Sequence, residues 1–182
     1  FRNFVQPSVA ALDAAFARLR DGGAEQLVLD LRYNGGGLVS VAQHLASLIA
    51  GPTTVGKVFV RFTHNDKQAS RDSTYDFESK PQALGVRRLV VITTRGSASA
   101  SEAVVNGLRP YMQVRTVGER SYGKPVGQYG FDFCDKVLYA VSFLVTNARS
   151  EADYFDGIPA DCAAPDDVDR PLADPREASL AE

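Results

Sequence analysis

The sequence predicts an α/β fold with a mainly parallel sheet and helices on its faces. Three short runs, at 26–31, 88–93 and 114–117, have the length and composition of strands. Helical periodicity follows the first and second runs, and this alternation of strands with helices is typical of a parallel sheet. Two later runs, at 128–133 and 137–146, predict an antiparallel C-terminal β-hairpin.

The first half of the chain contains two predicted helices. The first begins with Ser8 as its N-cap and ends at Gly22, and its apolar residues recur at helical spacing. These residues are Val9, Leu12, Phe16 and Leu19. The second helix is predicted over 38–50, before a strand over 57–62. Residues 63–82 are polar and poor in large aliphatic side chains, so we expect a long exposed loop there.

The second half contains one further predicted helix and a tail. The helix is predicted over 99–108, directly after the second strand of the sheet. Residues 161–182 are acidic and rich in proline, and a last short helix is expected to begin near Pro175. We therefore divide the chain into a core of residues 1–160 and this C-terminal tail.

The composition is that of an ordinary globular protein. Of the 182 residues, 45% are hydrophobic and 23% are charged, and the net charge of −2 gives no electrostatic attraction for nucleic acid or an anionic membrane. No apolar run approaches the roughly 20 residues of a membrane span. No metal-site spacing is present, and we expect no cofactor. The chain opens with Phe1, which suggests a fragment or a processed product.

The two cysteines, Cys134 and Cys162, allow two interpretations. They are either free, partly buried thiols, or one disulfide that ties the end of the hairpin to the tail. The disulfide would imply an oxidising compartment.

Three loops are expected to meet at one edge of the sheet. Residues 32–37, 94–99 and 118–124 each follow a predicted parallel strand, and the carboxyl ends of such strands lie at the same edge. Ligands of open parallel sheets bind at this edge. We therefore expect the glycine turn, the serine cluster and Lys124 to lie close together.

The glycine turn has three interpretations. In a dinucleotide fingerprint, Gly35 and Gly37 would match the first two glycines, but Ser40 occupies the third position. The turn could also serve only as a tight connection before a helix. In the third interpretation it is an oxyanion hole, in which the N–H of Gly36 or Gly37 approaches a developing negative charge.

The serine cluster places three hydroxyls at the start of a helix: Ser97, Ser99 and Ser101. A serine is a strong nucleophile only when a base removes its proton. The two histidines, His44 and His64, lie far from this segment in the sequence, so Lys124 is the expected base. A lysine acts as a base only when neutral, and burial and a helix N-terminus both favour the neutral form. Ser99 and Glu102 also match a capping box, which alone would explain a helix start.

Three motifs of the chain resemble those of the carboxyl-terminal processing (tail-specific) serine peptidases. Members of that family carry a strand ending in D-L-R-x-N-x-G-G, then S-A-S-A-S-E, and then G-K-x-x-x-Q. This chain carries the corresponding segments in that order, at 30–37, 97–102 and 123–128. Gly35 stands in place of a common proline, and Pro125 in place of a common glycine.

The resemblance implies a role for each residue of these motifs. Ser99 is the implied nucleophile, because its spacing from Lys124 is that of the family. Lys124 is the implied general base, and Gln128 orients it. The implied oxyanion hole consists of the N–H of Gly36 or Gly37 together with the N–H of Ala100.

The same resemblance implies a fold, a substrate and a location. The fold is a ClpP/crotonase-like spiral of ββα units, and the substrate is a polypeptide bound in extended form at a sheet edge. Members commonly carry a PDZ domain, which is not visible in this sequence: it either lies upstream of Phe1 or never existed in this protein. The implied location is periplasmic, cell-envelope-associated or secreted. The sequence gives no indication of oligomeric state.

Two other functions fit such a fold. A non-catalytic ligand- or peptide-binding module, of the kind seen in interphotoreceptor retinoid-binding proteins, has no need of Ser99 and Lys124. A crotonase-like acyl-CoA enzyme also uses paired N–H groups but gives no reason to pair these two side chains. The presence of both, with Gln128, favours the peptidase.

Overall fold

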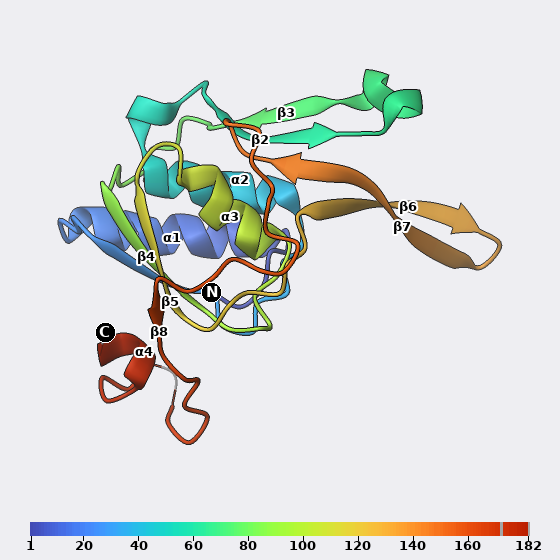
Figure 1. The fold of residues 1–182 in the computed structure, drawn as a ribbon. Helices are drawn as coiled ribbons and strands as arrows, with labels where there is room; N and C mark the ends of the chain where they lie inside the picture. The colour runs from blue at the N-terminus through green and yellow to red at the C-terminus, as the bar shows by residue number, and fades with distance from the viewer. Residues whose placement is uncertain (172, 182) are drawn as a thin grey trace.

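Two four-stranded sheets organise the chain in the computed structural model, which describes residues 1–171 and 173–181 (Figure 1). The first sheet is parallel throughout and has the order β1-β4-β5-β8. Its strands are β1 (Leu27–Asp30), β4 (Arg88–Thr93), β5 (Gln113–Gly118) and β8 (Cys162–Ala163). The predicted α/β class with a parallel sheet is therefore confirmed.

The second sheet is antiparallel and has the order β3-β2-β7-β6. Its strands are β2 (Val58–Thr63), β3 (Ser73–Asp76), β6 (Val126–Phe133) and β7 (Lys136–Thr146). Strands β6 and β7 form a long hairpin that extends away from the body of the molecule (Figure 1). This hairpin is the predicted pairing of 128–133 with 137–146, although β8 and a short helix still follow it in the chain.

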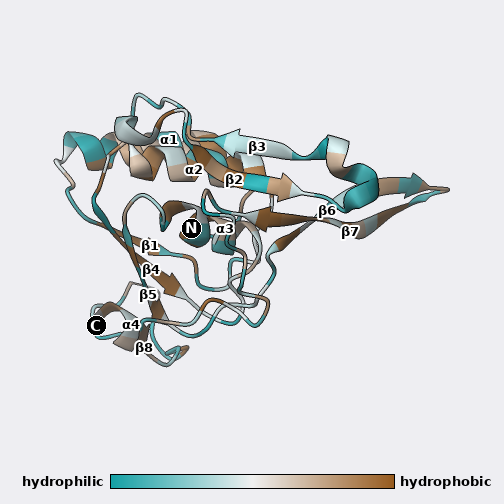
Figure 2. Cartoon of the chain, turned by 45° about the horizontal axis from the view of Figure 1, so that its top comes forward, coloured by the Kyte–Doolittle hydropathy of each residue, from teal (hydrophilic) through white to brown (hydrophobic). Residues whose placement is uncertain are grey.

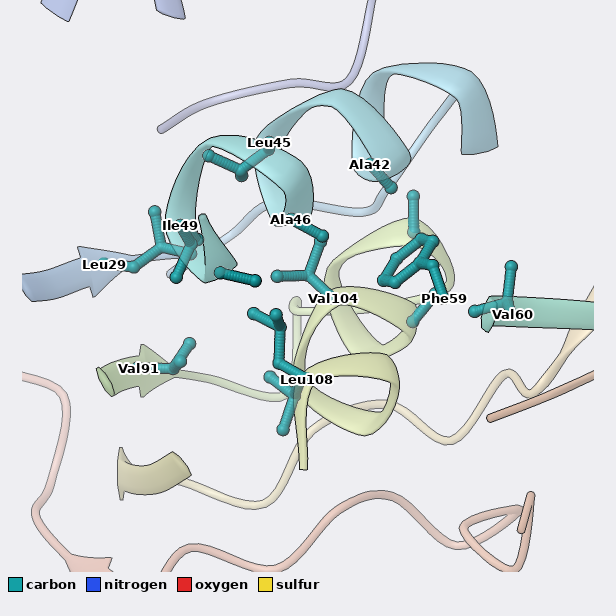
Figure 3. Close-up of a cluster of buried hydrophobic side chains, with 14 of the residues drawn as sticks. Leu29, Ala42, Leu45, Ala46, Ile49, Phe59, Val60, Val91, Val104 and Leu108 are labelled. Carbon is teal, nitrogen blue, oxygen red and sulfur yellow. The ribbon is translucent and has the colours of Figure 1, made fainter. Parts of the chain in front are cut away.

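Three helices pack beside the parallel sheet: α1 (Ser8–Asp21), α2 (Val39–Ala50) and α3 (Ala100–Leu108). Helix α2 is apolar around most of its circumference and is buried from Val41 to Ala50 except at Gln43, because other elements surround it. Figure 3 shows side chains of α2 and α3 meeting those of β1 and β4 and Phe59 of β2. The core thus lies between the two sheets, with α2 and α3 inside it.

A glycine allows α3 to approach the antiparallel sheet closely. A Cβ atom at Gly107 would lie 2.4 Å from the ring of Phe59. Any larger residue would therefore push α3, whose N-cap is Ser99, away from β2. The helix position, and with it the position of the serine cluster, depends on this contact.

The prediction that residues 63–82 form a loop is wrong for part of this segment. It contains a 3-10 helix, η2 (Asp66–Arg71), and the edge strand β3, which pairs with β2. The side chains of β3 are only partly buried because it lies at the edge of the sheet, and its polar sequence therefore resembles a loop. A second short 3-10 helix, η1 (Pro52–Thr54), follows α2.

Two terminal predictions also need correction. Helix α1 has Pro7 as its N-cap, and Ser8 lies within the helix, where its hydroxyl donates to the carbonyl of Asn3. The last helix is α4 (Ala178–Ala181), which begins after Pro175, and the tail also contributes β8 to the parallel sheet. Leu172 and Glu182 of the predicted tail lie outside the described residues.

The strand over 26–31 is buried on one side only. Leu29 is buried, whereas Val28 is exposed on the outer side of the parallel sheet. Figure 2 shows hydrophobic segments on β4, β5 and α2, which form the inner layers. None of the described helices is long and apolar enough to cross a membrane.

The two cysteines form no disulfide. Cys134 lies at the turn of the hairpin, and Cys162 lies in β8 of the other sheet. Both are free and exposed, so the disulfide interpretation is wrong, and so is the expectation of partial burial.

Candidate active site

The three loops that follow β1, β4 and β5 meet at a cleft of about 660 Å³. We name the lining from the glycine turn together with Ser99 and Ala100 the Ser99 wall, and the lining from the 124–128 segment the Lys124 wall. The cleft also has an apolar part, lined by Phe62, Ala103, Phe143 and Val145. The sequence prediction that these loops converge is therefore confirmed.

Ser99 has an unusual backbone conformation at the turn from β4 into α3. Its φ is 55° and its ψ is −112°, a combination that non-glycine residues rarely adopt. Such a conformation costs about 1–3 kcal/mol and persists only where the surroundings enforce it. Strained residues of this kind concentrate at functional sites, and here the strain holds a partly exposed serine at the cleft.

The glycine turn lies directly against the serine cluster. A Cβ atom at Gly36, whose φ is 96°, would lie 2.7 Å from the carbonyl oxygen of Ala98 and 2.9 Å from the Cβ of Ser99. The hydroxyls of Ser97 and Ser101 fasten the two segments together by donating to the carbonyls of Leu31 and Asn34, respectively. These two serines are buried and have structural roles.

The candidate oxyanion donors differ in their availability. The N–H of Gly36 donates to the side-chain oxygen of Asn34 at 3.0 Å and is therefore already engaged. Among the hydrogen bonds of residues 1–171 and 173–181, none uses the N–H of Gly37 or Ala100. The geometry therefore favours the pair of Gly37 and Ala100 as donors to a ligand in the cleft.

Lys124 and Gln128 belong to the Lys124 wall of the cleft. The Nζ of half-buried Lys124 donates to the Oε1 of Gln128 at 2.9 Å, and the Nε2 of Gln128 donates to the carbonyl of Tyr139 at 3.1 Å. Gln128 thus has the predicted contact with Lys124. Within the described part of the chain, no hydrogen bond joins the hydroxyl of Ser99 to the Nζ of Lys124.

Glu102 joins the backbone of the serine cluster to that of the Lys124 segment, which the sequence did not predict. Glu102 is only 1% exposed, and its carboxylate accepts four hydrogen bonds. The donors are the N–H groups of Ser99 (2.9 Å), Gly123 (2.7 Å) and Lys124 (2.8 Å) and the hydroxyl of Ser121 (2.5 Å). The capping box accounts for the first contact only. The other three fix the backbone of the candidate base relative to that of the candidate nucleophile.

The C-terminal segment also contacts the glycine turn. The guanidinium of Arg32 is buried and pairs with Asp30 and with Glu177, and the hydroxyl of Tyr33 donates to Asp166. The hydrogen bond to Asp30 raises the pKa of the Arg32 guanidinium, although burial opposes the charge. Burial likewise opposes ionisation of Asp30, but the hydrogen bonds from Arg32 outweigh it and lower the pKa of that carboxyl. The sequence did not predict this cluster, because Glu177 and Asp166 lie far from Arg32 and Tyr33 along the chain.

No group of three or more His, Cys, Asp or Glu side chains suitable for a metal ion occurs among the residues that the structure describes. The polar groups of the cleft include the hydroxyl of Ser99, the amino group of Lys124, the amide of Gln128 and backbone N–H groups. Together they provide a nucleophile, a potential proton acceptor and donors for an oxyanion.

The fold and this set of groups define a serine-peptidase class of protein. The chain belongs to peptidase family S41, whose family model matches residues 1–163. The resemblance to carboxyl-terminal processing peptidases that the three motifs predict is thereby confirmed.

Individual relatives agree with this membership. The chain is 33% identical over 128 residues to a carboxyl-terminal-processing protease of Synechocystis sp., an alignment covering 70% of this chain and 28% of the relative. It is 33% identical over 140 residues to a chloroplastic C-terminal processing peptidase of Tetradesmus obliquus, covering 76% of this chain and 28% of the relative. The chain thus spans less than a third of the length of these relatives.

Solved structures show the same fold. A putative S41 protease from Bacteroides fragilis superposes with a TM-score of 0.92 at 26% identity, covering all of this chain and 51% of the other. A photosystem II D1 C-terminal processing protease superposes with a TM-score of 0.73 at 26% identity, covering 90% of this chain and 40% of the other.

Proposed function

We propose that the chain is the catalytic core of a serine endopeptidase that cleaves polypeptides with a Ser99–Lys124 dyad. The observation that carries the proposal is the strained backbone of Ser99, which holds this serine in a cleft that Lys124 also lines. A serine that served only as a helix cap would not need this conformation. Membership of family S41 supports the same activity.

In the proposed mechanism, the Oγ of Ser99 attacks the carbonyl carbon of the scissile peptide bond while a neutral Lys124 accepts the hydroxyl proton. The N–H groups of Gly37 and Ala100 stabilise the oxyanion, and Gly36 is the alternative to Gly37 if the bond to Asn34 breaks. Lys124 then protonates the leaving amine, and water hydrolyses the acyl-enzyme. Before the attack, the Nζ of Lys124 approaches the hydroxyl of Ser99 while one of its N–H groups still donates to Gln128, a tightening that catalytic groups often undergo when substrate binds.

The substrate is proposed to bind as an extended segment beside β6. This strand is the last in its sheet, and its residues Val126, Gly127 and Gln128 line the cleft. An edge strand offers free backbone N–H and C=O groups, to which an extended polypeptide can pair. A scissile bond near Ser99 would then lie within reach of both the candidate base and the candidate oxyanion donors.

The wider features of the family belong to the same proposal. They comprise a ClpP/crotonase-like spiral of ββα units, a core at 1–160 with an acidic segment at 161–182, and a PDZ domain elsewhere in the whole protein. The proposed location is periplasmic, cell-envelope-associated or secreted.

Single substitutions test the proposed dyad. Ser99→Ala and Lys124→Ala should each reduce cleavage of an unstructured protein by at least ~10³-fold, because each removes a group of the reacting unit. Lys67→Ala is the matched control, since Lys67 is exposed in η2, away from the cleft. If either cleft variant cleaved as fast as the control, the dyad assignment would be wrong.

One observation favours a second candidate function, a non-catalytic peptide- or ligand-binding module. The Nζ of Lys124 contacts Gln128, and the described residues show no hydrogen bond from it to Ser99. A binding module would retain a peptide in the cleft without cleaving it. The cleavage assay distinguishes the two functions when combined with peptide binding measured by fluorescence anisotropy.

A further inference from the structure

The hairpin β6–β7 has an apolar face beyond the cleft. Val137, Tyr139 and Val141 of β7 are 47%, 64% and 64% exposed, respectively. Val137 pairs with Asp132, Tyr139 with Gly130 and Val141 with Gln128. Directly paired residues of antiparallel strands point to the same side, so these three side chains lie on the side of Gln128. We name this surface, formed by Val137, Tyr139 and Val141, the cleft-side face.

The cleft-side face is continuous with the candidate active site. Gln128 and Tyr139 both line the cleft, and the Nε2 of Gln128 donates to the carbonyl of Tyr139. Figure 1 shows that the hairpin carries this surface outward from the body of the molecule. A polypeptide that leaves the cleft along the hairpin would therefore pass Tyr139 before it reaches Val137, nearer the tip.

Gly130 opens the cleft-side face toward the free edge of β6. A Cβ atom at this position would lie 3.1 Å from Cγ1 of Val137 and 3.2 Å from Cε1 of Tyr139. The two side chains therefore lean over the glycine, across the strand that ends the sheet. A segment paired with β6 would meet an aromatic ring and a valine methyl group rather than backbone alone.

We propose that the cleft-side face binds the substrate polypeptide outside the cleft and selects segments with apolar side chains at alternate positions. This inference rests on the proposed peptidase function. An extended segment presents every second side chain to one surface, which matches the regular spacing of the three β7 residues. Exposed aromatic and aliphatic clusters of this kind mark interaction sites. Asp132 is the charged residue on this face, so acidic segments are disfavoured.

The opposite face of the hairpin provides a matched control. Leu138 pairs with Phe131 and is 62% exposed, close to the exposure of Tyr139, but it points to the other side. On that side Tyr129 packs against His64 and Phe143, of which Phe143 reaches the cleft, whereas neither Leu138 nor Phe131 lines it. A substitution of Leu138 therefore removes a similar exposed apolar group from the same strand without altering the cleft-side face.

The test measures binding in the full chain carrying Ser99→Ala, which prevents cleavage. Two fluorescein-labelled peptides share the sequence that fills the cleft and differ beyond it, where one has valine and the other serine at alternate positions. Fluorescence anisotropy should give at least ~10-fold tighter binding of the valine peptide. Tyr139→Ser and Val141→Ser should each remove most of that preference, whereas Leu138→Ser should retain it. Circular dichroism confirms that each variant is folded.

Three results would overturn the inference. The first is equal binding of the two peptides by the Ser99→Ala chain. The second is a loss of peptide preference in the Leu138→Ser control as large as in the Tyr139→Ser variant. The third is a change in the oligomeric state of the Tyr139→Ser variant, seen as a different mass in solution, without a change in peptide preference. The last result would assign the face to contact between copies of the chain. A failure of the peptidase proposal is recognised separately: the chain with Ser99 intact would then bind the valine peptide preferentially but would cleave neither peptide.

Discussion

The two walls of the cleft are held in different ways. The wall that carries Ser99 is fixed by buried hydrogen bonds from Ser97 and Ser101 and by close backbone contact at Gly36. The wall that carries Lys124 is fixed in its backbone by Glu102, but among the described residues the side chain of Lys124 hydrogen-bonds to exposed Gln128 alone. The nucleophile is therefore preorganised, whereas the base keeps a side chain that can turn.

This difference indicates where catalysis is sensitive to substitution. A change to the fixed wall should cost both stability and activity, because buried polar groups would lose their partners. A change to the Lys124 side-chain contacts should cost activity alone. The following predictions test this distinction in order of decreasing expected effect.

Replacement of Glu102 by alanine should have the largest effect. It leaves the hydroxyl of Ser121 and the N–H groups of Ser99, Gly123 and Lys124 without their buried acceptor. An unsatisfied buried group costs about 1–3 kcal/mol, so we expect a loss of about 4 kcal/mol in the free energy of unfolding. Urea denaturation measures this quantity. A loss below about 1 kcal/mol would show that Glu102 does not hold the two walls together.

Gly36→Ala should have the next largest effect. The new Cβ would meet Ala98 and Ser99 at a backbone φ that alanine rarely adopts, so we expect a loss of about 2–3 kcal/mol in unfolding free energy and a strong loss of cleavage. Gly35→Ala is the matched control, since nothing lies within 4 Å of a Cβ there and its φ is not positive. Its unfolding free energy should change by less than about 0.5 kcal/mol. Equal effects of the two substitutions would contradict the close approach at Gly36.

Gln128→Ala should reduce kcat about tenfold while leaving the unfolding free energy nearly unchanged. It removes the acceptor that holds the Nζ of Lys124 but retains the base itself, so only part of the contribution of general-base catalysis is lost. Steady-state kinetics and urea denaturation together check both parts of the prediction. A large loss of stability would mean that the two walls do not differ as described.

Asp30→Asn should have a smaller, pH-dependent effect. The pKa of Asp30 is lowered in the folded chain because hydrogen bonds from Arg32 outweigh the opposing effect of burial. Its contribution, about 1 kcal/mol, is therefore present above the unfolded pKa of about 3.9 and is lost as pH falls through the lower folded value. The difference in unfolding free energy between the unaltered chain and the variant should shrink progressively as the pH falls below about 3.9. A constant difference from pH 7 to pH 2 would contradict this assignment.

Local patterns predict much of this fold and site. The alternation of strands and helices predicts the parallel sheet, and the common edge of its strands predicts that Ser99, Lys124 and the glycine turn converge. The contact between Lys124 and Gln128 is implied by the resemblance of the 123–128 segment to the family motif. The first two predictions need only short segments and the geometry of a parallel sheet.

The features that the sequence did not predict depend on contacts between distant segments. Strand β3 is polar because it lies at an edge, so its sequence resembles a loop. Glu102 satisfies a local capping pattern, which conceals its three contacts with the 121–124 segment. The burial of Arg32 depends on Glu177 at the far end of the chain. Local sequence patterns cannot predict such pairs, because the two partners are far apart in the sequence and their spacing follows no regular period.

The central claim is that Lys124 activates Ser99 in this cleft. The most direct measurement is the rate of covalent labelling by a fluorophosphonate, followed from pH 6 to pH 10, with the labelled residue identified by mass spectrometry. We expect labelling of Ser99 alone, at a rate that rises with pH, and loss of this labelling in Lys124→Ala. Labelling of another serine, or labelling of Ser99 at an unchanged rate in Lys124→Ala, would contradict the account.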